Sequence, residues 1–392
     1  MKLGKLIFTC CLTHVALAAG SEPCKRPLTY IATVDGIPWK FSVSNGVAEI
    51  HDANPRYGVF SDYGVYSDRA YRTPNIPAIP ESTSGAISVP STLAGYRVVK
   101  IGGGAFRGCT NLSAVSISPG VREIGVRAFQ DCRTIREVTI PDSVQNIDWL
   151  AFIRCASLEK VNGFAQGTNI YKSAFHSCEA LKSFHFPATL RNIGAKAFSM
   201  SGLTEITIPA AVTNIGAEAF FGCNAMRKMS LPADLDSIGD GAFMGCDHVT
   251  EAELPRKLDR IQSRVFSHCL RLRKVSLPEH LRSIGDEAFY NCFALSQVAF
   301  PNSLTNIGDR AFLGCTSLEA VSIPCGLEAL GVDVFFGCAA LKRVRFSGDA
   351  PRIGRGLPFA TNIVVEAVEG TKGWDGDGWR NYKIEFVSPS SR

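Results

Sequence analysis

A short internal repeat dominates the chain. An Ala-Phe pair, replaced by Val-Phe in two copies, begins at eleven positions that are 23 residues apart except for one interval of 22. These positions are Ala105, Ala128, Ala151, Ala174, Ala197, Ala219, Ala242, Val265, Ala288, Ala311 and Val334. A fixed period between about 20 and 50 residues is typical of a solenoid, in which each unit packs only on its neighbours. The repeat therefore predicts a single array of coils with end pieces rather than several globular domains.

Each repeat has two halves. The first half, Leu-x-x-Val-x-Ile-Pro, alternates apolar with small or polar residues, as at Leu295, Val298 and Phe300. This alternation predicts a short strand with one buried face, which Pro ends because it lacks an N–H. The second half, Leu-x-x-Ile-Gly-x-x-Ala-Phe-x-x-Cys, predicts a turn, a brief extended piece and a short helical or 3₁₀ turn. The expected fold is an α/β repeat solenoid of eleven coils: a right-handed superhelix, mostly β and turns, with a parallel sheet of short strands.

Two repeats depart from the pattern. Residues 161–167 replace the strand end, the Pro and the Leu without a change in length, so we expect a local irregularity there. The 22-residue interval follows Phe198, where Ser201, Gly202 and Leu203 stand one residue short and without the Cys. This joint loss favours the interpretation that the Cys and its turn form one structural unit.

The first residues have the pattern of a secretory signal. Lys2 and Lys5 precede a mostly apolar run over residues 6–17, and Ala16-Leu17-Ala18 matches an A-x-A cleavage site. The apolar run is too short to cross a bilayer, and no later stretch is long and apolar enough. The sequence predicts export after cleavage behind Ala18, to a secreted or cell-surface location.

Four segments are expected along the chain. Residues 1–20 are the signal peptide, 21–86 an N-terminal β-rich cap or small module, 87–346 the solenoid, and 347–392 a C-terminal cap. Caps are expected because stacked repeats leave an apolar end exposed. In the N-terminal segment, Asn45-Gly46 stands between two alternating stretches and predicts a hairpin, since both turn residues tolerate positive φ.

Composition and motifs point away from several classes of function. The formal charge of +5, from 41 Lys and Arg against 36 Asp and Glu, is too small and dispersed to suggest nucleic-acid binding. No paired carboxylates or nucleophile–base spacing is apparent in residues 21–100, and we expect no catalytic residues, no cofactor and no metal site.

A cysteine stands three residues after nearly every repeat Phe. Metal sites use clustered C-x₂₋₄-C spacing, whereas here one Cys falls in each coil. Parallel side chains in register suit bridging poorly, and buried Cys behaves as a small hydrophobe. We expect buried free thiols, with some disulfides or metal binding as alternatives, and an exposed Cys325. The ladder comprises Cys109, Cys132, Cys155, Cys178, Cys223, Cys246, Cys269, Cys292, Cys315 and Cys338.

The repeat unit resembles the BspA-like, or Treponema-type, leucine-rich repeat over about residues 87–346. Known members of that family are bacterial surface or secreted proteins, some of which bind host matrix proteins or other bacteria. The resemblance implies a binding role and supplies no catalytic residues. It therefore favours an exported, monomeric repeat protein that acts in protein binding or adhesion without catalysis, and whose partner is a protein or a cell-surface ligand.

The candidate binding residues lie at outward positions of the predicted strands. Their charges alternate along the array, which predicts a compact polar patch; the alternative is that opposite charges neutralise one another between coils. Two other functions stay open: a structural spacer that displays the N-terminal module, and an enzyme hidden in the N-terminal region. The candidate partner-binding residues are Glu205, Lys228, Glu251, Glu253 and Lys274.

Overall fold

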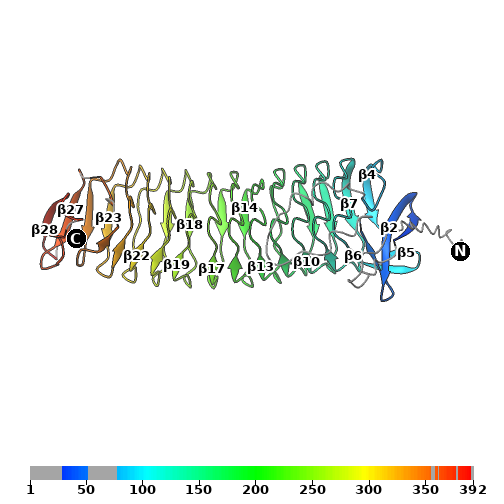
Figure 1. Ribbon diagram of the computed structural model, residues 1–392, viewed down its shortest axis with the longest axis horizontal. Coiled ribbons are helices and arrows are strands. Elements are labelled where there is room, and N and C mark those ends of the chain that lie inside the picture. The colour runs from blue at the N-terminus through cyan, green and yellow to red at the C-terminus, as the bar shows by residue number, and fades with distance from the viewer. Residues whose placement is uncertain (1–28, 52–76, 355–357, 361, 377, 390–392) are drawn as a thin grey trace, which may run out of the picture. The chain divides into compact units, whose positions relative to one another are not determined.

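The computed structural model describes residues 29–51, 77–354, 358–360, 362–376 and 378–389. The predicted signal peptide and its cleavage site lie outside the described residues. The chain divides into two compact units, residues 1–181 and 182–392, which are described separately below. Figure 1 shows that the strands within each unit follow one another side by side in chain order.

The strands of unit 1 belong to two sheets. One begins with the antiparallel strands β1, β2 and β3 and continues in parallel through β6, β8, β10 and β12, with β5 paired to β6; the other has the order β11-β9-β7-β4. The strands are β1 (Tyr30–Val34), β2 (Ile37–Ser44), β3 (Val47–Ile50), β4 (Gly85–Val89), β5 (Thr92–Leu93), β6 (Tyr96–Ile101), β7 (Leu112–Ile117), β8 (Glu123–Ile124), β9 (Glu137–Ile140), β10 (Asn146–Ile147), β11 (Lys160–Gly163) and β12 (Asn169–Ile170).

Unit 2 is parallel throughout its described pairings. Its ladders are β13-β15-β17, β14-β16, β18-β20, β19-β21-β22-β24-β26 and β23-β25-β27-β28. The strands are β13 (Asn192–Ile193), β14 (Glu205–Thr207), β15 (Asn214–Ile215), β16 (Lys228–Ser230), β17 (Ser237–Ile238), β18 (Glu251–Glu253), β19 (Arg260–Ile261), β20 (Lys274–Ser276), β21 (Ser283–Ile284), β22 (Asn306–Ile307), β23 (Ala320–Ile323), β24 (Ala329–Leu330), β25 (Arg343–Phe346), β26 (Arg352–Ile353), β27 (Val364–Val368) and β28 (Lys383–Val387).

Most coils therefore carry two strands. The longer one is the predicted Leu-x-x-Val-x-Ile strand, and the shorter one is a two-residue strand that ends at the Ile before the Gly position. Equivalent residues pair across the coils, as Ile147 with Ile170 and Ile284 with Ile307. The parallel solenoid is thus confirmed, with about 13 turns rather than eleven. Part of the predicted C-terminal cap takes part in the sheet, because β27 and β28 extend its ladder in parallel.

The hairpin predicted at Asn45-Gly46 is present. β2 and β3 pair antiparallel, and Ser44 faces Val47 across the turn. Asn45 has a φ of 51° and Gly46 a φ of 72°, the left-handed values that this two-residue turn requires. The Asn-Gly pair was therefore a sufficient local signal for this element.

The repeat Phe side chains form the centre of the core. In unit 1, the rings of Phe106, Phe129 and Phe152 stack at centroid distances of 4.8 and 4.9 Å, with planes within 5° of parallel. All three rings are fully buried, and the repeat Ala beside each ring is buried too. A stack of this kind gives each ring its main apolar contacts from the preceding and following coils, so neighbouring coils stabilise one another.

The segment around Ala-Phe forms hydrogen-bonded turns, and no helix is assigned within the described residues. Alternate N–H groups have different partners: Ala128 and Gln130 donate within their own coil, whereas Phe129 donates to the carbonyl of Ala151 in the next coil. The residue before the Ala has a positive φ, 59° at Arg127. A left-handed residue interrupts a right-handed helix, so the expected short helical turn does not form here.

The two repeats that depart from the sequence pattern have different outcomes in the structure. In residues 161–167, the predicted irregularity is present: Gly163 and Phe164 have φ values of 80° and 65°. At the 22-residue interval, Ser201 is buried at the Cys position, and its N–H donates to Phe198 as a Cys N–H does elsewhere. The turn therefore survives without the Cys, which corrects the interpretation that the two are lost together.

Two predicted strands are absent from the described structure. Residues 181–186 form no strand, and the second case lies in the coil that follows Phe289. The segment Leu295 to Phe300 forms only an isolated bridge, from Gln297 to Lys274. The Phe300 side chain stands where most repeats have Ile, and its ring packs edge-on against Phe312 at 5.6 Å. Phe346 stands at the equivalent position within β25, so a Phe at this position is compatible with a strand.

Candidate functional site

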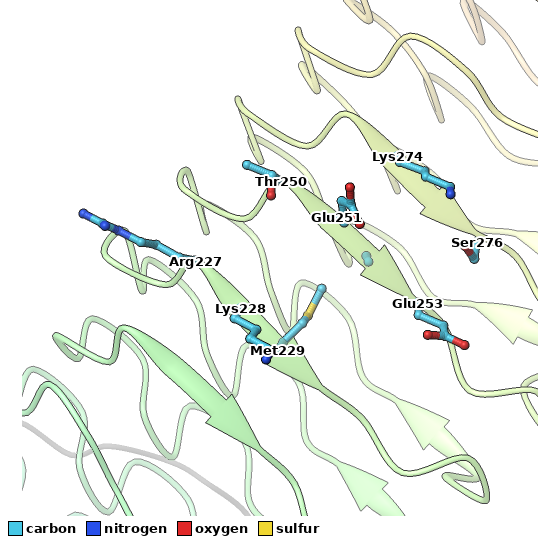
Figure 2. A pocket seen from close by; sticks show the side chains of 9 residues that line it. Arg227, Lys228, Met229, Thr250, Glu251, Glu253, Lys274 and Ser276 are labelled. Carbon is cyan, nitrogen blue, oxygen red and sulfur yellow. The ribbon is translucent and has the colours of Figure 1, made fainter.

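A shallow groove lies in unit 2 between β16 and β18. These neighbouring strands belong to two separate pairs, β14-β16 and β18-β20, and are not joined in one ladder. The space beside them has a volume of about 460 Å³. Figure 2 shows the side chains of three successive coils around it, and they are Arg227, Lys228, Met229, Thr250, Glu251, Glu253, Lys274 and Ser276.

The alternating burial of the short strands determines which side chains face this groove. In β18, Glu251 and Glu253 are exposed and Ala252 is buried between them. In β16, Lys228 is exposed and Met229 is half-buried, and Figure 2 shows its thioether extending into the space between the strands. The strand period of two therefore places charges at the rim and an apolar side chain lower in the groove.

The five predicted residues are brought close together, but not as one continuous sheet. Glu205 pairs in register with Lys228, and Glu251 with Lys274. The predicted patch assumed aligned strands from Glu205 to Lys274, whereas the structure divides them into two pairs with the groove between. No periodic feature of the repeat signals this break, so sequence reasoning missed Arg227, Met229 and Thr250 as lining residues.

The charged groups at the groove are not paired with one another. Within the described residues, no ion pair forms between Glu205 and Lys228 or between Glu251 and Lys274, although their strands face in register. Other coils do form such pairs at the same 23-residue spacing, for example Arg264 with Glu287 at 2.8 Å. The groove thus retains charges of both signs that are available to a partner.

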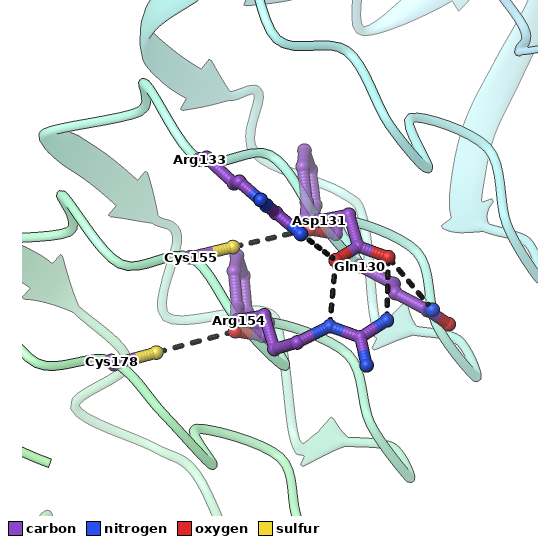
Figure 3. A network of polar contacts seen from close by, with 8 residues as sticks. Gln130, Asp131, Arg133, Arg154, Cys155 and Cys178 are labelled. Atoms are coloured by element: carbon purple, nitrogen blue, oxygen red, sulfur yellow. Dashed lines mark hydrogen bonds and ion pairs between the residues drawn. The ribbon is translucent and has the colours of Figure 1, made fainter. Parts of the chain in front are cut away.

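An ion pair in unit 1 differs from the unpaired charges of the groove. The guanidinium of Arg154 donates from Nε and Nη2 to the two carboxylate oxygens of Asp131, each at 2.7 Å, and Gln130 donates to Asp131 at 3.0 Å (Figure 3). Burial opposes ionisation of Asp131, but the hydrogen bonds from Arg154 and Gln130 and the nearby charges outweigh it and hold the pKa of Asp131 below its usual value. This arrangement joins two coils and leaves little charge available to a partner.

The predicted cysteine ladder consists of buried free thiols in the structure, and Cys325 is exposed as expected. Each ladder Sγ from Cys132 onward donates to the Phe carbonyl of the preceding coil, at 2.9 to 3.3 Å. Figure 3 shows two of these contacts, from Cys155 and Cys178. Burial raises the pKa of Cys223 to about 11, even though Ser201 hydrogen-bonds its sulfur. Such thiols are unreactive, because the thiolate is the nucleophile.

Two further properties concern the described part of the chain. Its side chains include no group of three or more His, Cys, Asp or Glu residues placed to hold a metal ion. It also includes no helix with the length and apolar character needed to span a membrane.

Comparison with known proteins supports the fold. The family model described as "BspA type Leucine rich repeat region" matches the chain in six copies, over residues 99–227, 168–280 and 236–361. A leucine rich cell surface protein from Faecalibacterium prausnitzii is 23% identical with a TM-score of 0.54, covering 94% of this chain and 97% of that one. A leucine-rich repeat protein from Bacteroides ovatus is 24% identical with a TM-score of 0.47, covering 91% and 99%. No curated protein matches the chain.

Proposed function

The chain belongs to the BspA-type leucine-rich repeat family, and on this premise we propose that it is a non-catalytic protein that binds a protein or cell-surface ligand through the groove between β16 and β18. The family membership supports a protein-binding role. In this proposal the protein acts as an exported monomer in adhesion or surface binding, and the N-terminal pattern up to Ala18 supports export.

The observation that carries this proposal is the set of unpaired charges around a half-buried Met. Glu251 and Glu253 stand exposed on one strand, and Lys228 stands exposed on the strand across the groove. Charges that are exposed and unpaired in the free protein can pair with a partner without first losing an internal partner. Met229 adds an adaptable apolar contact of the kind that binding surfaces use.

The groove predicts a modest affinity with strong selectivity. Its described lining contains no Trp or Tyr, the residues that supply most binding energy at protein interfaces. Exposed charges of both signs contribute mainly to the rate and specificity of association. A partner should therefore present complementary charges in two rows, and its binding should weaken as salt screens them over a Debye length of about 8 Å.

A triple charge reversal tests this site. The variant Glu251→Lys, Glu253→Lys and Lys274→Glu changes the groove, while Glu319→Lys, Glu328→Lys and Lys342→Glu alters exposed residues elsewhere in unit 2 with the same change in net charge. Immobilised wild-type and variant proteins would capture partners from host or neighbouring-cell extracts, after equal thermal midpoints have shown that each is folded. We expect the groove variant to lose its specific partner and the control variant to retain it.

Two outcomes would contradict the proposal. If both variants capture the same partner as the wild type, the groove is not the binding surface and the repeat array acts as a spacer. If both lose it equally, the binding depends on overall charge rather than on this site.

A further inference from the structure

A second groove lies in unit 1. It has a volume of about 640 Å³ and lies between the β5-β6 hairpin and the turn that follows β7. The hairpin places Thr92 opposite Arg97, and the N–H of Val98 donates to Ser91 at 2.9 Å. The groove is therefore built on hydrogen-bonded backbone on the hairpin side.

The opposite wall is a glycine turn that approaches the hairpin closely. Gly120 has a φ of 104°, and a Cβ added there would come within 3.8 Å of the Val98 carbonyl oxygen. The Gly120 N–H donates to the hydroxyl of Ser143, which itself donates to the Val121 carbonyl. These bonds connect the turn to the next coil, so both walls of the groove are supported by secondary structure.

The lining combines apolar surface with cationic groups. Val47, Val98 and Val99 supply the apolar part, and Arg97, Lys100 and Arg122 supply the charge. A cavity of several hundred Å³ with apolar walls and a few charged groups is typical of a ligand-binding cleft.

The three cations are not equivalent. Lys100 lies between two carboxylates, 3.0 Å from Glu123 and 3.8 Å from Glu49, so its charge is offset within the protein. Arg97 and Arg122 are exposed, and neither forms an ion pair within the residues that the structure describes. The groove therefore offers two available guanidinium groups beside an apolar strip.

From this arrangement we propose that the groove binds an extended acidic segment of a partner protein, with Asp or Glu carboxylates on Arg97 and Arg122 and the methylene groups of the same side chains against Val47 and Val99. Guanidinium groups match carboxylates because they donate two parallel hydrogen bonds. An extended segment alternates its side chains between two directions, so every second one can be acidic and face the arginines. The carboxylates of Glu49 and Glu123 beside Lys100 disfavour a broad anionic membrane surface.

This inference does not depend on the function proposed for the groove in unit 2. The two grooves have different residues and different charge: the unit 2 groove carries both signs unpaired, and this one carries unpaired cations alone within the described lining. The loss of one activity would leave the other intact.

The test is a binding measurement with a defined peptide. A fluorescein-labelled peptide in which Glu alternates with Val would be titrated with the full chain, and its anisotropy followed at low and at physiological salt. We expect saturable binding that weakens with salt. The variant Arg97→Glu, Arg122→Glu should weaken binding about tenfold or more, since a charged hydrogen-bonded contact contributes about 1.5–3 kcal/mol and 1.4 kcal/mol corresponds to tenfold.

Matched controls separate this site from a general charge effect. The variant Arg191→Glu, Arg256→Glu reverses two other exposed arginines with the same change in net charge and should bind the peptide as the wild type does. Arg97→Lys with Arg122→Lys should bind with intermediate affinity, because it keeps charge but loses the paired donors.

Three results would overturn the proposal. Equal weakening in both charge-reversal variants would show non-specific attraction, and equal binding of a peptide with Lys in place of Glu would remove the role of the arginines. Capture of phosphatidylserine vesicles through Arg97 and Arg122, without binding of the acidic peptide, would assign the groove to a membrane surface instead.

Discussion

The two units carry the same repeat but arrange their longer strands differently. In unit 1, β4, β7, β9 and β11 form one continuous parallel sheet. Unit 2 also has such a sheet, β23-β25-β27-β28, but its strands β14, β16, β18 and β20 form two separate pairs. The Phe rings are stacked at 4.8 to 5.1 Å in unit 1 and at 5.1 to 5.7 Å in unit 2. Ring spacing does not account for the break, because the rings of Phe220 and Phe243, in the coils of β16 and β18, lie 5.4 Å apart, closer than the rings of the paired coils on either side at 5.7 and 5.6 Å. A groove can arise in a repeat protein without any insertion.

The largest expected effect comes from removing one ring of each stack. Phe129→Ala and Phe243→Ala should each lower the free energy of unfolding by about 3–5 kcal/mol, as other large-to-small core changes do. We expect the greater loss for Phe129, whose neighbouring rings lie at 4.8 and 4.9 Å, than for Phe243, whose neighbours lie at 5.4 and 5.6 Å. Urea unfolding followed by circular dichroism measures both. A larger loss for Phe243 would show that ring spacing does not report packing.

Two glycines with similar backbone angles sharpen the comparison. Gly163 in unit 1 has a φ of 80°, and an added Cβ would meet the Ile140 carbonyl oxygen at 1.9 Å. Gly245 in unit 2 has a φ of 72°, but its nearest neighbour would lie at 3.6 Å. Gly245→Ala should cost about 1 kcal/mol for the left-handed backbone, and Gly163→Ala about 3 kcal/mol, because strain and a backbone clash combine.

Thermal midpoints of the two glycine variants, compared with the wild type, provide the measurement. Equal costs would mean that the coil containing Gly163 can move away from Ile140, and that the continuous sheet of unit 1 is more deformable than its hydrogen bonding suggests.

A smaller difference is expected between two ion pairs. Asp131→Asn in unit 1 removes a doubly hydrogen-bonded pair. Glu287→Gln in unit 2 weakens a contact of 2.8 Å with Arg264 and a longer one of 3.9 Å with Arg310. Both pairs are partly exposed, so we expect a loss of at most about 1 kcal/mol, greater for Asp131.

The dependence on pH identifies the Asp131 contribution. The folded pKa of Asp131 is lowered, so its stabilisation is fully present above the unfolded value of about 3.9 and is lost as the pH falls through the folded value. The difference between wild type and Asp131→Asn should therefore shrink in acid. A difference that stays constant down to the lowest pH would show that packing, not charge, is responsible.

The smallest difference is expected for the ladder thiols, which are buried in both units. Neither Cys155 nor Cys246 should react with a thiol reagent in the native protein, whereas exposed Cys325 should react quickly. Cys325→Ser should therefore remove one rapidly labelled thiol, and Cys246→Ser should remove none. Rapid labelling of Cys246 would show that the wider spacing of unit 2 permits local opening.

The core of this fold could be predicted from sequence because the same apolar positions recur in each repeat. Each Phe, Ala and Cys position recurs, so the buried ladders followed from counting. The Ala-Phe turn was harder, because positive φ at residues such as Arg127 has no residue-type signal and reverses the helical expectation. The groove was harder still, since the loss of pairing between β16 and β18 has no counterpart in the residues of the repeat.

The candidate residues illustrate the same limit to prediction. Outward positions such as Glu251 and Lys274 followed from strand alternation, and the structure does place them on exposed positions of facing strands. Met229 was not among the candidates predicted from sequence, and its place in the groove depends on the missing ladder beside it. The alternation of apolar and polar residues thus predicts which side chains point outward. Which of them meet across neighbouring coils can be seen only in the three-dimensional structure.

The alternating donors of the Ala-Phe turn have a consequence for how such a chain can change in length. The Phe129 N–H bonds forward to Ala151, while the Asp148 N–H bonds back to Ile124. Duplication or loss of one whole coil leaves each N–H donor with an equivalent acceptor. A partial deletion in the turn would instead leave backbone N–H groups of both neighbouring coils without an acceptor. The single short coil obeys this constraint, because its missing residue lies after Ser201, beyond the turn. Viable length variants of this protein should therefore differ by whole coils or by residues outside the Ala-Phe turn.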